Sequence, residues 1–224
     1  MKNLQKMGGI AALYAGVAYL VGFALYIVVL NYSSDIAPIQ QVASFVDNQS
    51  IWYTLNLLIY TLFGFFLVVL ALALYERLKA GSPALVQTAT VFGIFWGCVI
   101  IISGMIYNAG MENVVNLFGK DPAQAATVWL AIDSVLEGLA GGNEILGGIW
   151  ILLLSWAALR AGELPKILNY LGVAVGVAGI ISVVPALAEI FIYIFALGQI
   201  VWFIWLGIVM LRSNTSAAAA SAAA

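Results

Sequence analysis

The sequence has no histidine, a single cysteine and very few charged residues. Histidine and several cysteines supply the usual protein ligands of zinc, copper and haem, so we expect no metal and no cofactor. Cys98 is the only cysteine and cannot form a disulfide within the chain. Ser–His and Cys–His catalytic arrangements are excluded on the same grounds, and no catalytic residue is assigned.

Charged residues make up only 8% of the chain, whereas 64% of residues are hydrophobic and the mean hydropathy is +1.08. A soluble domain has about 25% charged and roughly 45–50% apolar residues. The composition therefore indicates an integral membrane protein, with the lipid bilayer as its first partner. The net charge of -2 is small and the basic residues are scattered, which argues against a nucleic-acid partner.

What the sequence does contain is long apolar runs. A helical run of about 20 residues crosses the roughly 30 Å hydrocarbon core of a bilayer. The runs predict six transmembrane helices, at about 7–30, 51–75, 86–109, within 126–159, 167–185 and 190–211. We expect an all-α, polytopic membrane protein with a single six-helix domain over residues 1–212. The segment 213–224, SNTSAAAASAAA, is a low-complexity tail.

The basic residues predict the orientation, because short loops rich in Lys and Arg remain in the cytoplasm. Only Lys120 lies on the side of the predicted helices away from the termini. The other seven basic residues are Lys2, Lys6, Arg77, Lys79, Arg160, Lys166 and Arg212. Both termini are therefore predicted to be cytoplasmic, and the loops 31–50 and 110–125 are predicted to face outward.

The two outer loops have helical patterns of their own. The first, DIAPIQQVASFVDNQ, predicts a short amphipathic helix on the outer surface, with apolar Ile36, Ile39, Val42, Ala43 and Val46 at helical spacing. GMENVVNLFGKDPAQAAT is expected to behave likewise, with Asp121 as N-cap and Pro122 in the first turn of the next helix. The alternative is that both loops only connect helices.

The segment SVLEGLAGGNEILGGIW, residues 134–150, places acidic residues inside the fourth apolar run. In a regular helix Asp133, Glu137, Glu144 and Gly148 share one face. A charge at mid-membrane costs at least about 2.5–3.5 kcal/mol and so normally faces the bundle interior or water. We expect Asp133 to be solvated, Glu137 intermediate, and Glu144 buried and either protonated or paired with a cation.

The glycines of this run and its neighbours predict close helix packing. Asn143 and Glu144 lie between the pairs Gly141–Gly142 and Gly147–Gly148, which allow the helix to bend, widen or approach another helix closely. A packing seam with one hydrogen-bonded acid is the alternative to a ligand site. Four further glycines are assigned to helix packing alone: Gly93, Gly97, Gly172 and Gly176.

Other polar residues fall in the outer half or near the middle of the predicted bundle, at about 1.5 Å per residue. These are Tyr26, Asn56, Asn108 and Gln199. The inner half has almost none, and this asymmetry favours an outward-facing polar pocket around the fourth helix. Asn143 and Glu144 would form the floor of that pocket, with Glu137 and Asp133 toward its mouth.

The six-helix pattern, the N-terminal KNLQKMGGIAALYAGVAYLVG and the segment GGNEILGGIWILLLSWAAL resemble a family of small bacterial membrane proteins catalogued only as a domain of unknown function. The resemblance covers almost the whole chain up to about Arg212. It implies a bacterial inner-membrane location and a six-helix domain. It implies no activity, ligand or catalytic residue.

Three classes of function remain open. The first is binding or transport of a cation, a proton or a small amphipathic molecule in the outward pocket. The second is an accessory subunit or lipid-binding scaffold that meets a second copy or a membrane-complex partner. The third, an intramembrane hydrolase, is disfavoured because Glu137 and Glu144 lie about 10 Å apart along a helix, too far to act as a pair.

Overall fold

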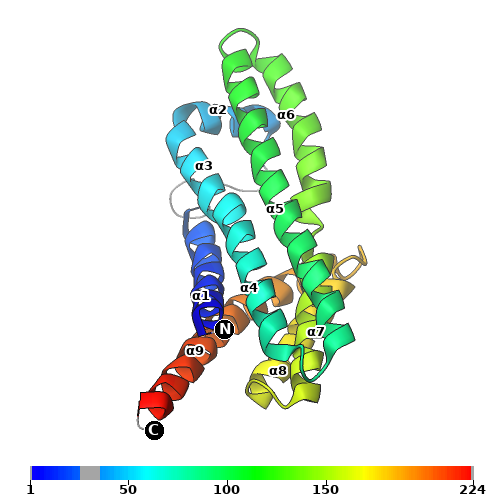
Figure 1. Ribbon diagram of the computed structural model, residues 1–224. Helices are drawn as coiled ribbons and strands as arrows, with labels where there is room; N and C mark the ends of the chain where they lie inside the picture. Colours follow the sequence, from blue (N-terminus) through cyan, green and yellow to red (C-terminus); the bar gives the residue numbers. More distant parts are fainter. Residues whose placement is uncertain (1, 26–35, 223–224) are drawn as a thin grey trace. The chain divides into compact units, whose positions relative to one another are not determined.

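A computed structural model of the chain describes residues 2–25 and 36–222, and this part of the chain is helical without a strand (Figure 1). Two of its segments, η2 and η3, are π-helical. The elements are α1 (Lys2–Ala24), α2 (Pro38–Asp47), α3 (Gln49–Asn56), η2 (Leu57–Leu62), α4 (Phe63–Leu78), α5 (Pro83–Phe118), α6 (Pro122–Leu136), η3 (Glu137–Gly141), α7 (Glu144–Ala161), α8 (Lys166–Ile181) and α9 (Ala188–Ala222). The predicted all-α class is confirmed.

Five helical runs of the described chain are long and apolar enough to cross a membrane. They are Asn3–Ala24, Gln49–Leu78, Pro83–Phe118, Pro122–Ala161 and Ala188–Arg212. The remaining apolar helix, α8, has 16 residues. It measures about 24 Å, shorter than the roughly 30 Å core. The described part of the chain therefore has five helical runs that could cross a membrane and one short apolar helix, as expected for a polytopic membrane protein.

The connection predicted over residues 110–125 is much shorter in the structure. Helix α5 has 36 residues and continues to Phe118, and α6 begins at Pro122. The polar residues of GMENVVNLF lie on the surface of α5. The helix continues through this segment and ends just before Gly119, the next glycine after Gly110. The predicted cap is confirmed: the Asp121 carboxylate accepts a hydrogen bond of 3.0 Å from the Gln124 amide. Helix α9 likewise continues beyond Arg212, through Ala222.

The chain divides into two compact units, each described by itself. Unit 1 comprises Met1–Val17, Phe65–Cys98 and Asn143–Ala224, and unit 2 comprises Ala18–Gly64 and Val99–Gly142. Helices α7, α8 and α9 therefore belong to unit 1 with the start of α5. Helices α2, α3 and α6 belong to unit 2 with the second half of α5.

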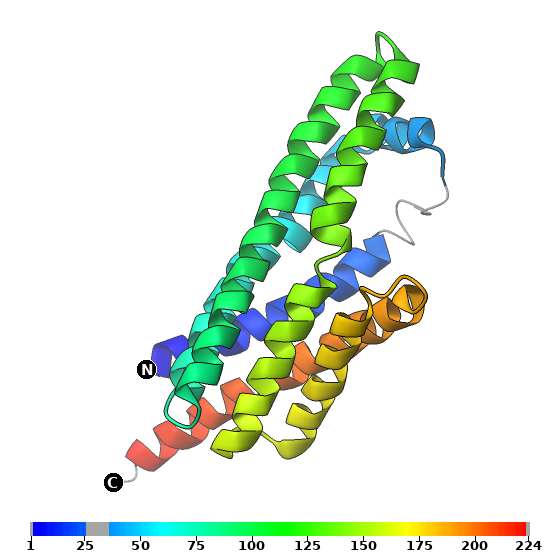
Figure 2. The ribbon, with the colours of Figure 1, turned by 90° about the vertical axis from the view of Figure 1, so that its right-hand side faces the viewer.

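Unit 1 is built around direct backbone contact between α7 and α8, which lie side by side in both views (Figures 1 and 2). A Cβ added at Gly148 would lie 2.7 Å from the carbonyl oxygen of Gly176. One added at Gly179 would lie 2.7 Å from the carbonyl oxygen of Glu144. Side chains are excluded from this contact, so only glycine permits it. The packing role predicted for Gly148 and Gly176 is supported, and Gly179 is an addition that spacing did not single out.

Aromatic side chains fill the rest of the unit 1 core. Trp150 of α7 contacts Trp96 of α5 and Trp202 of α9, each with ring centroids 5.8 Å apart. Gly93 borders Trp150, and Gly147 borders both Trp96 and Phe195. These glycines leave room for the large rings, which supports their assignment to packing.

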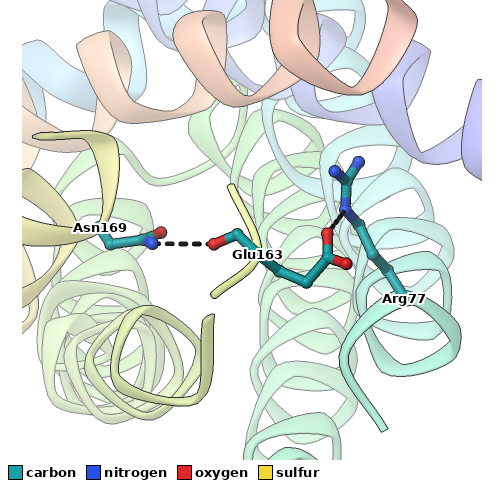
Figure 3. Close-up of polar contacts among 3 residues, drawn as sticks. All are labelled: Arg77, Glu163 and Asn169. Carbon is teal, nitrogen blue, oxygen red and sulfur yellow. Dashed lines mark hydrogen bonds and ion pairs between the residues drawn. The ribbon is translucent and has the colours of Figure 1, made fainter. Parts of the chain in front are cut away.

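The turn between α7 and α8 is held by polar contacts at one end of unit 1 (Figure 3). Arg77 Nε, at the end of α4, donates to Glu163 Oε2 at 3.1 Å, and Asn169 Nδ2 of α8 donates to the Glu163 backbone oxygen at 3.0 Å. Gly162 and Leu164 both have left-handed φ values, 66° and 62°. A non-glycine residue pays roughly 1–2 kcal/mol for that conformation, so Leu164 depends on these contacts.

The same end of unit 1 gathers basic residues. Gly8 of α1 meets Ala73 of α4 and Met210 of α9, and Gly81 meets Ala161 at the end of α7. These contacts bring together the chain segments that carry Lys6, Arg77, Lys79, Arg160, Lys166 and Arg212. Glu144 and Glu189 begin α7 and α9 and therefore lie toward the other end. The basic residues of unit 1 thus gather at one end of its helices, and two of its acidic residues lie toward the other end.

Unit 2 contains the amphipathic helix predicted in the first outer loop, as α2. Of the predicted apolar row, Val42 is buried whereas Ile39 and Val46 are 42% and 41% exposed, and Gln41 and Phe45 are buried beside Val42. Helix α2 packs against α6, and the Trp129 indole N–H donates to Gln41 Oε1 at 2.7 Å. A polar residue therefore anchors the helix, which apolar spacing alone could not predict.

Gly148→Ala is expected to lower the stability of the protein, because its Cβ would lie 2.9 Å from the Ile180 nitrogen and closer still to Gly176. Overpacking of this kind costs about 1–3 kcal/mol. Thermal unfolding in detergent measures the difference. Gly119→Ala is the matched control, since nothing lies within 4 Å of its Cβ position. Equal melting temperatures would contradict the backbone contact between α7 and α8.

Candidate functional site

The predicted irregularity of the fourth apolar run is confirmed. Helix α6 ends at Leu136, five π-helical residues follow, and Gly142 and Asn143 form a turn before α7 begins at Glu144. A π-turn and a break change the angle per residue, so 3.6-residue spacing no longer applies across them. The predicted common face is therefore wrong for Glu144, whereas Asp133 and Glu137 stay one helical turn apart, with the Glu137 N–H bonded to the Asp133 carbonyl oxygen. Asp133 and Glu137 belong to unit 2, and Glu144 belongs to unit 1.

The predicted gradient of exposure also differs from the structure. Asp133 is half-buried, Glu137 is exposed and Glu144 is half-buried. The prediction used depth along a straight helix, whereas accessibility depends on which neighbouring helix covers each side chain. Glu144 lies where its own backbone oxygen meets Gly179 of α8. Glu144 therefore begins the closely packed helix pair of unit 1.

Asn143, and not Glu144, makes the cross-helix hydrogen bond at this point. The Trp96 indole N–H of α5 donates to Asn143 Oδ1, and both side chains are buried. The bond ties the start of α7 to α5 within unit 1. Asn143 was predicted as a pocket residue, and the structure gives it a positioning contact; Trp96 was not singled out by the sequence.

The remaining predicted pocket residues do not gather around Glu144. Gln199 of α9 is only 1% exposed, and its Oε1 has no hydrogen-bond partner among the described residues. Its neighbours one turn away, Phe195 and Trp202, face Gly147 and Trp150. Gln199 therefore lies inside unit 1. Tyr26 lies outside the described residues.

Two predicted residues meet directly in unit 2. Asn56 Nδ2 at the end of α3 donates to Asn108 Oδ1 of α5 at 3.0 Å. Asn56 is fully buried, and its own Oδ1 has no hydrogen-bond partner within the part of the chain that the structure describes. Leaving a buried acceptor unpaired costs about 1–3 kcal/mol. This amide oxygen is therefore a place where an additional hydrogen-bond donor would be favourable.

Tyr60 lies on the helical run that carries Asn56. It follows Asn56 by four positions, and its ring lies 6.1 Å from that of Tyr107, centroid to centroid. Its Cβ lies 2.6 Å from the Cβ position of Gly104, so it packs onto the α5 backbone one turn from Asn108. Asp133 lies one turn after Trp129 in α6, and the Trp129 ring lies 5.3 Å from that of Tyr107. We call Asn56, Tyr60, Asn108 and Asp133 the Asn56 cluster.

A buried aromatic group adjoins the Asn56 cluster. Its rings are Phe45, Trp52, Tyr107 and Trp129, with neighbouring centroids 4.6 to 6.2 Å apart. The Trp129 N–H donates to Gln41, and the Trp52 N–H donates to Ser44 Oγ at 3.3 Å. Both indoles thus have acceptors of their own. The rings give the cluster an apolar, electron-rich wall.

The π-helical segments η2 and η3 border the Asn56 cluster in sequence. Segment η2 begins directly after Asn56 and contains Tyr60, and η3 begins one turn after Asp133. Single π-turns occur frequently at functional sites, because the wider turn displaces side chains from their regular spacing. Their position at two of the cluster's helices marks this region as the strongest candidate site.

The glycines predicted for packing have mixed surroundings. A Cβ at Gly172 would meet Ser155 and Trp202, which supports packing, and Gly97 is buried. Gly142 is exposed and has only backbone oxygens of its own segment nearby, at 3.8 Å. Gly141 is π-helical in backbone, and its surroundings lie outside the described side chains. The glycine pair before Asn143 thus serves the helix break, whereas the pair after Glu144 serves packing.

Among the described residues, no three acidic or cysteine side chains come together in a way that could hold a metal ion. The chemistry available at the Asn56 cluster is therefore hydrogen bonding, the carboxylate charge of Asp133 and contact with aromatic faces. That set can bind and orient a small molecule.

A protein-family model described as "Domain of unknown function (DUF4386)" matches residues 14–209, most of the chain. No curated protein and no solved structure matches the chain. The match supports the resemblance seen in the sequence and adds no ligand or reaction.

Asn143→Leu is expected to destabilise the protein by about 1–3 kcal/mol, because it leaves the buried Trp96 N–H without this acceptor. Trp96→Phe removes the donor instead. In a double-mutant cycle of detergent unfolding, the two changes should couple by about 1 kcal/mol. Strictly additive losses would show that the hydrogen bond does not stabilise the start of α7.

Proposed function

Because the chain belongs to a family described as a domain of unknown function, we propose its function from its own geometry: it is a membrane protein that binds a small polar or cationic molecule at the Asn56 cluster. The observation that carries the proposal is the fully buried Asn56 Oδ1, which has no partner among the described residues. In an apolar surrounding such a group is costly unless a donor reaches it. A bound molecule would supply that donor.

The residues around Asn56 fit a ligand better than they fit simple packing. Asn108 Oδ1 already accepts from Asn56, so the amide pair is oriented with its second oxygen available. Asp133 adds a carboxylate, and polar groups inside membrane helices usually mark ligand contacts or pathways. The cluster lies within helical runs long enough to span a membrane. Binding or passage of a cation, a proton or a small amphipathic molecule is the matching class of function.

Buried polar atoms without a hydrogen-bond partner among the described residues also occur in unit 1, but they are weaker evidence for a ligand site. Trp150 Nε1 lies directly against α5 at Gly93, and Ser155 Oγ lies directly against α8 at Gly172. Neighbouring helices fill the space at those atoms. Gln199 Oε1 is the next candidate after Asn56, but its nearest neighbours along α9 are engaged with aromatic rings and glycine. The predicted pocket is accordingly moved from Glu144 to the Asn56 cluster.

An accessory or lipid-binding role is the second candidate. The glycines of α7 and α8 are occupied within unit 1, so they do not offer a seam to a partner. Helix α9 instead presents an exposed apolar row, Ile190, Tyr193, Leu197 and Val201, each more than half exposed. Such a row suits lipid tails or another membrane helix.

We also propose six spans with both termini in the cytoplasm of a bacterial inner membrane. The basic end of unit 1 supports this orientation, because cytoplasmic ends carry most Lys and Arg. Helix α8 would be a short sixth span.

The orientation predicts opposite labelling of two exposed positions. In a Cys98→Ala background, Gly119→Cys should react with an impermeant maleimide on intact cells. Ala80→Cys, in the turn after α4, should react only after permeabilisation. Labelling of Ala80→Cys alone on intact cells would reverse the orientation.

Ligand binding at Asn56 predicts stabilisation by a small molecule with a hydroxyl donor. Choline and its neutral isostere 3,3-dimethylbutan-1-ol both have one and are suitable probes. At least one should raise the melting temperature of the protein, with the shift lost in Asn56→Leu. Ser103→Ala is the matched control, because Ser103 is buried in the same unit and bonds only its own helix at Val99. No shift with either probe, or a shift kept in Asn56→Leu, would contradict the proposal.

A further inference from the structure

We propose that the turn between α7 and α8 is a binding site for an anionic phospholipid. Arg160 and Lys166 bind the phosphate of the headgroup. Trp156 and Tyr170 contact the upper part of the acyl chains. The site lies in unit 1 and does not depend on ligand binding at Asn56. It follows from the close packing of the two helices, from the ion pair in their turn and from the side chains exposed beside it.

The packing of α7 on α8 brings the two basic residues to neighbouring helix ends. A Cβ added at Gly172 of α8 would overlap the Ser155 hydroxyl oxygen of α7, so the helices are in close contact there. This contact lies within two helical turns of both basic residues. Arg160 belongs to the last turn of α7, and Lys166 is the first residue of α8. Their long side chains therefore start from adjacent points of the same turn.

The acidic residue of this turn is engaged elsewhere. Glu163 Oε2 accepts from Arg77 Nε of α4 at 3.1 Å (Figure 3). Arg160 and Lys166 are exposed, and no ion pair joins either of them to an acidic side chain of the described residues. Two positive charges at the turn therefore have no counter-ion among the described residues. A phosphate from outside the chain would supply one through charge-assisted hydrogen bonds.

Exposed aromatic residues lie one turn along each helix from the two charges. Trp156 precedes Arg160 on α7, and Tyr170 follows Lys166 on α8. The two aromatic residues are 51% and 62% exposed. In membrane proteins tryptophan and tyrosine collect at the level where headgroups meet acyl chains. A basic residue with an aromatic residue one turn deeper, repeated on two packed helices, fits a phospholipid better than a soluble anion.

Both pairs lie on the side of α7 and α8 that faces away from α9. Helix α9 packs on Val175 of α8 and on Trp150 of α7. At about 100° per residue, Lys166 lies roughly opposite Val175 around α8, and Trp156 lies about 120° from Trp150 around α7. The basic and aromatic side chains of the two helices therefore share one exposed side, which a single lipid can cover.

The test compares phosphatidylglycerol with phosphatidylcholine of the same acyl chains. Each lipid is added to the delipidated full chain in neutral detergent, and binding is followed by native mass spectrometry. A basic residue at headgroup level adds about fivefold to the affinity for an anionic lipid, so phosphatidylglycerol should bind roughly 25-fold more tightly. Arg160→Gln combined with Lys166→Gln should remove most of this preference. Both residues are exposed, so the melting temperature of this double variant should remain that of the wild type.

Lys6→Gln combined with Lys79→Gln is the matched control, because it removes two exposed basic residues from the same end of unit 1, outside the α7–α8 turn. It should keep the preference for phosphatidylglycerol. Equal affinity of the wild-type protein for the two lipids would overturn the proposal. An equal loss in the two double variants would also overturn it, because the effect would then be diffuse charge and not a site.

A soluble competitor distinguishes a lipid from a free phosphate. Glycerol 3-phosphate has the phosphate but no acyl chains, and at the concentration of the lipid it should leave bound phosphatidylglycerol in place. Displacement of the lipid by this compound would overturn the assignment, because the turn would then recognise a phosphate without its acyl chains.

Discussion

In hydrocarbon, every buried polar group must find its partner within the protein, because no water is available to satisfy it. Most of the polar side chains in the helical core obey this constraint. Asn143 accepts from Trp96, Gln41 accepts from Trp129, and Asn169 donates to the backbone of Glu163. Each bond joins two elements and fixes their spacing. Asn56 meets the constraint only in part: its amide nitrogen donates to Asn108, whereas its oxygen has no hydrogen-bond partner among the described residues.

The two units meet the constraint with different chemistry. Unit 1 brings helix backbones into contact at glycines, stacks tryptophan rings and places its ion pair at a turn outside the apolar runs. Unit 2 holds amides, a carboxylate and tyrosines among its helices, next to two π-helical segments. The first arrangement suits a rigid bundle. Both units retain unpaired polar atoms, but in unit 2 the unpaired Asn56 oxygen belongs to an amide pair, and polar groups inside membrane helices are typical of a site with a function.

The sequence predicted what depends on composition and on local signals. Apolar runs predicted six spans, of which five are helices long and apolar enough to cross a membrane and the sixth is the short helix α8. Asp121 and Pro122 predicted a helix start, and the glycine pairs predicted a break before α7. The site depends on tertiary contacts that no local pattern contains. Tyr60 is indistinguishable in sequence from a core aromatic residue. The prediction that Glu144 shares a helix face with Asp133 and Glu137 was wrong because a π-helical segment and a turn interrupt the helical period before Glu144.

The central claim is that a molecule other than this chain occupies the space at Asn56 Oδ1. An experimental density map of the full chain in lipid nanodiscs, at a resolution that shows side chains and ordered ligands, tests it most directly. The account predicts a separate density feature within hydrogen-bond distance of Asn56 Oδ1 and beside Tyr60 and Asp133. A side chain of the protein bonded to that oxygen, or a dry contact with no space beside it, would contradict the account.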